Sequence, residues 1–229
     1  MFGLTPDEIT ALWLTFKLAG TVTIVLLFIS TPLAWWLARS RSSMVAFVSA
    51  LVALPIVLPP SVLGFYFLIA FSPQGVIGQL SQSLGMSGLA FSFSGLVIAS
   101  VIYSLPFVVQ PIQNAFVAME QSSLEAAATL GANPLACFFQ IALPNAKVGL
   151  LTGAILGFAH TVGEFGVILM IGGNIPGETQ VVSVKIYEYV ESLNYTQAHR
   201  LSAILLVFSF IVLFWVYLKQ KQAGLSGRV

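Results

Sequence analysis

The sequence has very few charged side chains. Only 7% of its 229 residues are Asp, Glu, Lys or Arg, whereas soluble domains carry about a quarter. So few charges cannot cover a surface that faces water. Together with 58% hydrophobic residues and a mean hydropathy of +0.96, they indicate an integral membrane protein. The net charge of +1 argues against the basic face that a nucleic-acid-binding protein needs, so no nucleic-acid partner is expected.

Residues that bind metals and nucleotides are also scarce. The single cysteine, Cys137, excludes a disulfide framework and a multi-cysteine metal cluster, and two histidines are too few for a three-histidine zinc site. No lysine follows a glycine, so the phosphate-binding loop of ATPases is absent. We therefore expect no catalytic residues, no metal site and no cofactor on this chain.

Long uncharged hydrophobic segments are abundant. A membrane-spanning helix needs about 20 mostly apolar residues, and no charge occurs between Arg41 and Glu120. Uninterrupted apolar runs favour helices, because the strands of a membrane barrel alternate polar and apolar residues. The predicted fold class is an all-α polytopic membrane protein with five transmembrane helices, at Leu18–Leu37, Met44–Phe71, Leu89–Gln110, Val148–Gly172 and Leu201–Leu218.

The distribution of Lys and Arg predicts the orientation, because these residues mark the cytoplasmic ends of spans. Five spans divide the Lys and Arg residues into two groups. The smaller group, on one side of the membrane, is Lys17, Lys185 and Arg200. The larger set on the other side is Arg39, Arg41, Lys147, Lys219, Lys221 and Arg228. This pattern predicts an N-terminus outside, a cytoplasmic C-terminus and a main cytoplasmic loop at Gln110–Asn145. The N-terminal residues carry no basic signal region, so the first span is expected to be a retained signal anchor.

Two segments have irregular patterns. Pro55, Pro59 and Pro60 interrupt the second span, which is either an approach segment followed by a helix starting near Pro59 or Pro60, or one kinked and tilted helix. On the outer side, residues 174–177 predict a turn before a short amphipathic helix at Val184–Leu193. Lys185 and Glu188 of this helix are expected to form an exposed pair of little energetic value.

The main cytoplasmic loop encodes two short helices. Ser122 and Glu125 have the spacing of a capping box, and Gly131 has the position of a left-handed residue that ends a helix. Asn133 and Pro134 then predict an N-cap and a first helical residue, with the second helix ending before Pro144. Such a small apolar unit must pack on the membrane domain or on a partner, unless it is an ordinary linker.

The spacing within this loop resembles that of a known family. Glu125-Ala126-Ala127, three further residues, Gly131, nine further residues and Ile141-Ala142-Leu143-Pro144 resemble the EAA loop of binding-protein-dependent ABC importer permeases. The stretches 54–60, Gly163-Glu164-Phe165-Gly166 and 174–179 are similar to the permeases of molybdate importers. The resemblance covers most of the chain. It implies a MetI-like ABC permease fold, with one transmembrane domain over residues 1–229 and a coupling loop at about 111–145.

The resemblance also implies a role and partners. The loop would be the coupling helix that docks on a separate cytoplasmic ATPase, with Glu125, Ala126, Ala127 and Gly131 on the docking surface and Ile141, Leu143 and Pro144 completing the motif. The partners would be a second copy of the chain, two ATPase subunits carrying ATP and Mg²⁺, an extracytoplasmic oxyanion-binding protein and membrane lipid. The implied function is molybdate import across a bacterial or archaeal plasma membrane. Sulfate, thiosulfate and tungstate remain open, because related permeases share the loop.

Ionisable residues in the fourth predicted span suggest a second site. His160 and Glu164 are four residues apart, and ionisable groups inside a membrane usually face protein or a water-filled cavity. With Gly163 and Gly166 they are candidates for the translocation path or gate; alternatively, the pair bonds internally and fixes packing. Hydroxyls that an oxyanion could contact include Ser61, Ser100, Ser104 and Thr161. A secondary transporter or channel without an ATPase, or a membrane scaffold, are the rival interpretations.

Overall fold

The computed structural model describes residues 3–83, 85 and 88–226; Arg228 lies outside this range, and the side chains of Lys219 and Lys221 are not described. Within the described residues the chain forms helices joined by turns, with no strand, and the predicted all-α class is confirmed. The elements are α1 (Pro6–Arg39), α2 (Met44–Val57), α3 (Pro60–Phe71), α4 (Val76–Ser83), α5 (Phe93–Val117), α6 (Gln121–Thr129), α7 (Pro134–Ala136), the π-helical turn η1 (Cys137–Ala142), α8 (Leu143–Asn145), α9 (Lys147–Gly163), α10 (Gly166–Gly172), α11 (Val182–Glu191) and α12 (Tyr195–Ser226).

Three helices are long and apolar enough to cross a membrane alone: α1, α5 and the first 21 residues of α12. Two further spans are possible if each bent pair counts as one: α2 with α3, bent by 110°, and residues 134–145 with α9, bent by 68°. The structure thus holds three to five candidate spans. The first begins at Pro6 rather than Leu18, and α5 continues to Val117, into the segment predicted to be loop.

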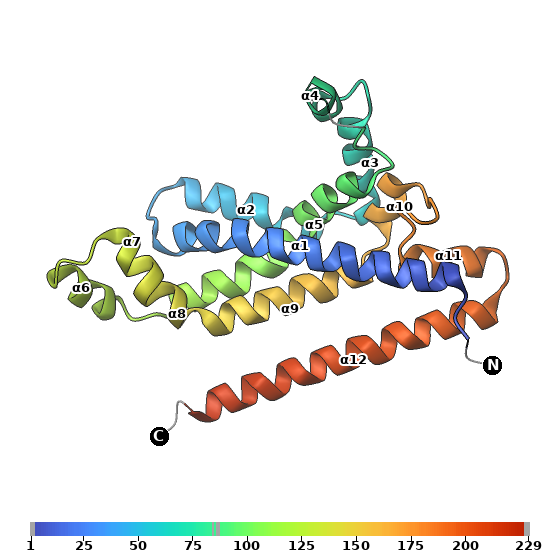
Figure 1. The fold of residues 1–229 in the computed structure, drawn as a ribbon. Coiled ribbons are helices and arrows are strands. Elements are labelled where there is room, and N and C mark those ends of the chain that lie inside the picture. Colours follow the sequence, from blue (N-terminus) through green and yellow to red (C-terminus); the bar gives the residue numbers. More distant parts are fainter. Residues whose placement is uncertain (1–2, 84, 86–87, 227–229) are drawn as a thin grey trace.

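The core forms where α1, α5 and α9 run alongside one another (Figure 1). Glycines spaced by four residues on α9 allow α5 to approach closely. A Cβ atom added at Gly149 would lie 2.5 Å from the Ala115 Cβ, and one added at Gly157 would lie 2.5 Å from a Val108 methyl group. Gly153 and Gly157 both lie against Val108 of α5, as small residues do at the interfaces of other membrane bundles.

The second predicted span is broken at its prolines. Leu58 is extended, as expected for the residue before a proline, and α3 begins at Pro60. The angle of 110° between α2 and α3 is too large for one kinked helix, so the structure confirms the interpretation in which a helix starts near Pro59 or Pro60. From this break α3 packs on α10, where an added Cβ at Gly64 would lie 2.8 Å from the Met170 Cβ.

The two ends of the bundle differ in what they carry (Figure 1). The C-terminal end of α1, the start of α9 and the α6–α8 segment lie at one end, which we call the α6 end. The N-terminus, α10, α11 and the start of α12 lie at the other, the α11 end. Arg39 and Lys147 therefore lie opposite Lys185 and Arg200, in agreement with the two predicted groups of basic residues. Which end faces the cytoplasm stays a prediction.

Candidate functional site

The first candidate site is the end unit, which we define as residues 121–145. Its first helix, α6, ends in a Schellman motif, in which Gly131 has a φ of +86° and the Ala132 N–H donates to the Ala127 carbonyl at 3.0 Å. The prediction that Gly131 is the left-handed residue that ends this helix is thereby confirmed. Because the turn needs a left-handed residue, glycine holds this angle without the cost that a side chain would add.

The predicted capping box at Ser122 is wrong. The helix α6 begins at Gln121, so Ser122 lies inside its first turn, and a serine caps a helix only from the residue that precedes it. The Ser122 hydroxyl instead donates to the Glu120 carboxylate at 3.3 Å.

The second helix of the end unit starts as predicted. Asn133 is the N-cap, its side-chain oxygen accepts from the Ala136 N–H at 2.7 Å, and Pro134 is the first helical residue. The predicted end before Pro144 is wrong, because helical backbone continues to Asn145. Pro144 is tolerated because it lies in the first turn of α8, where its missing N–H has no role, and the preceding turn widens to the π-helical η1.

The end unit leaves several apolar side chains uncovered. Leu130 is 89% exposed, Leu135 70% and Phe139 59%. Among the residues predicted to dock, Glu125, Ala126, Gly131 and Pro144 are exposed, whereas Ala127, Ile141 and Leu143 are half-buried. Exposed apolar patches of this kind mark surfaces that another molecule covers. The docking role of these residues stays a prediction.

A surface hollow of about 790 Å³ lies at the base of the end unit, between the ends of α5 and α9. Its lining is partly polar, although it lies at the end of an apolar bundle. The polar side chains in it are those of Asn114, Glu120, Ser123, Asn145 and Thr152.

The second candidate site lies where α9 ends, and we call residues 163–166 the break site. Glu164 has a ψ of 133° and terminates α9, so the predicted continuous span over Val148–Gly172 is wrong. His160 and Glu164 consequently do not lie four residues apart on one helix face. Two glycines within four residues lower the helix propensity here, and no proline marks the break.

Tertiary contacts fix the backbone of the break site. The Ser183 hydroxyl of α11 donates to the Glu164 carbonyl at 2.6 Å. A Cβ added at Gly166 would lie 2.8 Å from the Pro60 Cβ at the start of α3, whereas one added at Gly163 would meet nothing within 4 Å. The break site thus joins α9 and α10 to α3 and α11.

The side chains around the break site are buried or half-buried and largely hydrogen-bonded. His160 Nδ1 lies 2.9 Å from the Ser104 hydroxyl, which lies 3.1 Å from the Thr161 hydroxyl. The His160 ring stacks on Phe107 with centroids 3.9 Å apart. The alternative in which His160 bonds to Glu164 is therefore wrong, and the partner on α5 is one that sequence spacing could not reveal.

Glu164 is the exception. It is 4% exposed, and within the described part of the chain neither carboxylate oxygen has a hydrogen-bond partner. The buried Ser100 hydroxyl is near this carboxyl group and is also unpartnered. Among the described residues, no cluster of three or more His, Cys, Asp or Glu side chains could hold a metal ion.

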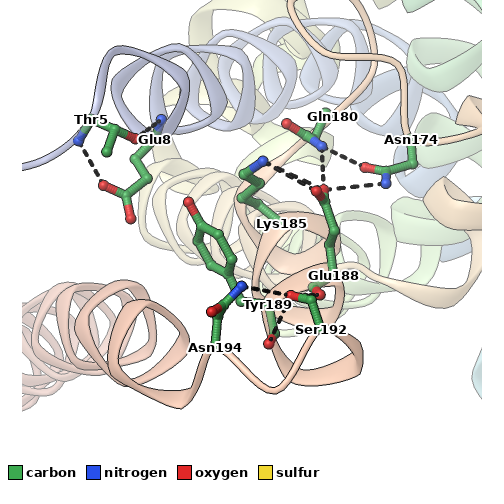
Figure 2. A network of polar contacts seen from close by, with 9 residues as sticks. All are labelled: Thr5, Glu8, Asn174, Gln180, Lys185, Glu188, Tyr189, Ser192 and Asn194. Atoms are coloured by element: carbon green, nitrogen blue, oxygen red, sulfur yellow. Dashed lines mark hydrogen bonds and ion pairs between the residues drawn. The ribbon is translucent and has the colours of Figure 1, made fainter.

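A polar network at the α11 end was only partly predicted (Figure 2). The pair of Lys185 and Glu188 forms at 3.4 Å, but Lys185 is 8% exposed rather than solvated. Gln180 joins the network by donating at 2.7 Å to both Glu188 and Asn174. Burial and the nearby Glu8 carboxylate raise the pKa of Tyr189 above its ordinary value.

The start of α1 closes this end of the molecule. Thr5 and Glu8 form a reciprocal capping box, and the Glu8 carboxylate also accepts hydrogen bonds from Arg200 of α12. This ion pair attaches α12 to the rest of the bundle at the α11 end, where α12 also packs on α11.

A helical bundle with three to five candidate spans, one of them broken at its prolines, is the architecture of a multi-pass membrane protein. Residues 30–221 match the family of binding-protein-dependent transport system inner membrane components, and the chain belongs to this family. It is therefore an inner-membrane transport component and not an enzyme. Membership selects the permease interpretation over the secondary-transporter, channel and scaffold alternatives.

Relatives align over nearly the whole chain. It is 55% identical over 224 residues to the molybdenum transport system permease protein ModB of Azotobacter vinelandii. The alignment covers 97% of this chain and 99% of that protein. It is 36% identical to a probable sulfate transport system permease protein cysT of Zygnema circumcarinatum, over 95% of this chain and 76% of that one. A putative molybdenum permease of Bacillus subtilis, YvgM, is 33% identical over 93% and 94% of the two chains.

Solved structures show the same fold. A bacterial ABC transporter that imports alginate matches with a TM-score of 0.77 at 16% identity, over 96% of this chain and 80% of that one. The methionine ABC transporter MetNI in an inward-facing conformation matches with a TM-score of 0.70 at 18% identity, over 91% and 92% of the chains. The predicted MetI-like permease fold is confirmed.

Proposed function

We propose that this chain is the permease subunit of an ATP-driven importer of molybdate in a bacterial inner membrane. The observation that carries the proposal is the 55% identity, over 97% of the chain, to a molybdenum permease. The sulfate permease relative is 36% identical, which makes sulfate the less supported substrate. Tungstate and thiosulfate are tetrahedral oxyanions too, and the uptake assay below includes tungstate as a competitor.

The end unit is the part of the chain that we assign to the ATPase subunit. Its helices are fixed by the Schellman motif at Gly131 and the Asn133 cap, so it is a stiff lever rather than a flexible linker. Its apolar residues, such as Leu130 and Leu135, need a partner to cover them. An amphipathic helix that enters a groove is a common solution. Glu125, Ala126, Ala127 and Gly131 would form the centre of the contact, with Ile141, Leu143 and Pro144 behind it.

The translocation path would lie between two copies of the chain. Up to five spans are few to enclose a solute path, and a two-fold dimer doubles them. Near the break site the half-buried His160 and the hydroxyls of Ser104 and Thr161 supply neutral hydrogen-bonding groups. We assign His160, Gly163, Glu164 and Gly166 to the gate. Glu164 would act by positioning α10, since a carboxylate in the path would repel an anion.

Uptake of radiolabelled molybdate tests the proposal. The chain is expressed with the ATPase and binding protein of its own organism in a bacterium that lacks its molybdate permease. We expect uptake that depends on all three proteins and that excess tungstate competes more strongly than excess sulfate. Uptake of labelled sulfate with no uptake of molybdate would overturn the substrate assignment, and molybdate uptake without the ATPase would overturn the importer mechanism.

A further inference from the structure

The end unit contacts the membrane bundle through the aromatic side chain of Phe138 and through Ala142, which is fully buried in the core. The ring of Phe138, in the π-helical turn, packs edge-on against Trp35 of α1 with centroids 5.5 Å apart. It also lies 6.3 Å from Phe116 of α5, and Trp35 and Phe116 themselves pack at 5.1 Å. Phe138 thus completes an aromatic cluster whose other two members belong to two core helices.

The other side of the cluster is fixed. Phe116 is fully buried, and the Arg39 guanidinium lies over the Trp35 ring, 5.1 Å from its centroid. A displacement of Phe138 would therefore move Trp35 and Phe116 together with α1 and α5, because neither side chain is free to move alone. Because α6 packs on the π-helical turn, displacement of α6 would reach Phe138 directly.

The covalent connections of the end unit are bent. Residues 134–145 meet α9 at 68°, and Ala146 at the joint has φ −85° and ψ 4°. On the other side, residues 118–120 leave the helical path between α5 and α6. A sharp bend at each connection transmits motion along the chain poorly, so side-chain packing is the direct mechanical contact between the end unit and the core. Phe138 is larger than Ala142, the other end-unit residue in the core cluster.

The structure also provides room for Phe138 to move. An apolar hollow of about 640 Å³ lies between α1 and the π-helical turn, lined by Phe28, Pro32, Phe138, Phe139 and Leu143 among others. A π-helical turn can revert to α-helix by shifting its register, and such turns occur often at functional sites. The ring thus has two neighbouring environments, the aromatic cluster and the hollow.

We propose that Phe138 is the positioning residue that transmits movement of the end unit to α1 and α5. The inference rests on the proposed function, because it concerns how docking of the ATPase subunit reaches the spans. It adds that the transmitting contact is a single aromatic side chain in the π-helical turn, outside the docking surface itself.

The test is Phe138→Ala in the purified complex of permease and ATPase, reconstituted in lipid vesicles with the binding protein. Uptake and ATP hydrolysis are measured on the same vesicles. We expect the ATPase subunit to co-purify at the wild-type ratio and ATP hydrolysis to continue. Uptake per ATP hydrolysed should fall about tenfold, within the range of coupling that residues linking two sites supply. Phe138→Leu, which retains most of the volume, should restore most of the loss.

Phe47→Ala is the matched control, because it removes the same side chain from an exposed position of α2, outside the end unit. Uptake per ATP should stay within about twofold of wild type. Equal ratios in Phe138→Ala and wild type would overturn the inference, as would equal losses in the two variants. Absence of the ATPase from the wild-type complex would instead overturn the proposed function.

Discussion

The end unit and the break site lie at the two ends of α9. They differ in how far the rest of the chain covers or bonds their residues. The end unit is regular and well capped, yet it leaves Leu130 and Leu135 uncovered. The break site is irregular, but its backbone is bonded to α11 and the nearby His160 to α5, whereas the Glu164 carboxylate lacks a hydrogen-bond partner among the described residues. A segment with regular, well-capped helices can therefore still leave apolar side chains without contacts inside its own chain. We propose that the end unit needs another protein to cover it, whereas the break site is held by the rest of its own chain.

The largest effect is expected for Gly131→Asp in the end unit. The substitution places a side chain at a φ of +86° and adds a charge to the exposed turn, although no atom lies within 4 Å of an added Cβ. We expect molybdate uptake to fall about tenfold or more, the size of a lost interface contact of ~2 kcal/mol, with unchanged abundance in the membrane.

The matched control is Gly85→Asp. Gly85 also has a positive φ, of +72°, and open space around it, but lies outside the end unit. Both variants carry the left-handed penalty of roughly 1–2 kcal/mol, so a loss confined to Gly131→Asp isolates the interface. Equal uptake in the two variants would show that the turn has no special role.

A second prediction concerns folding rather than coupling. Gly149→Ala would place a methyl group 2.5 Å from the Ala115 Cβ and 2.7 Å from the Pro111 carbonyl oxygen. Overpacking of this kind costs about 1–3 kcal/mol, so the melting temperature in detergent should fall. In Gly163→Ala the added methyl group would have no atom within 4 Å, so this variant should have the melting temperature of the wild type. If the two variants melt alike, the close packing of α9 on α5 is wrong.

Local signals made the end unit largely predictable, and the break site shows why the rest was not. Gly131 and the Asn133-Pro134 pair act through their own backbone angles and nearest N–H groups, which sequence alone defines. The end of α9 at Glu164 depends on Ser183 and Pro60, which are distant in sequence. The π-helical turn and the partner of His160 likewise depend on tertiary packing. An apolar run with two glycines therefore looked like one continuous span.

The smallest effect is expected for Ser183→Ala at the break site. It removes the hydroxyl that donates to the Glu164 carbonyl at 2.6 Å, which should cost ~1 kcal/mol and lower the melting temperature modestly. Ser192→Ala, on the exposed end of α11, removes a similar bond at 2.8 Å to the Glu188 carbonyl. Since water replaces that bond, the melting temperature of Ser192→Ala should be nearly that of the wild type. A larger change in Ser192→Ala than in Ser183→Ala would contradict the assignment of the break site as internally fixed.

Photo-crosslinking from the exposed leucines tests whether the end unit is the docking site of the ATPase. Leu130→Cys and Leu135→Cys, each with Cys137→Ser, are labelled with a photoreactive maleimide in membranes that also contain the ATPase subunit. Leu193→Cys, 71% exposed at the α11 end, is the control. We expect crosslinks to the ATPase from positions 130 and 135 and none from 193. No product from positions 130 and 135, or equal product from 193, would contradict it.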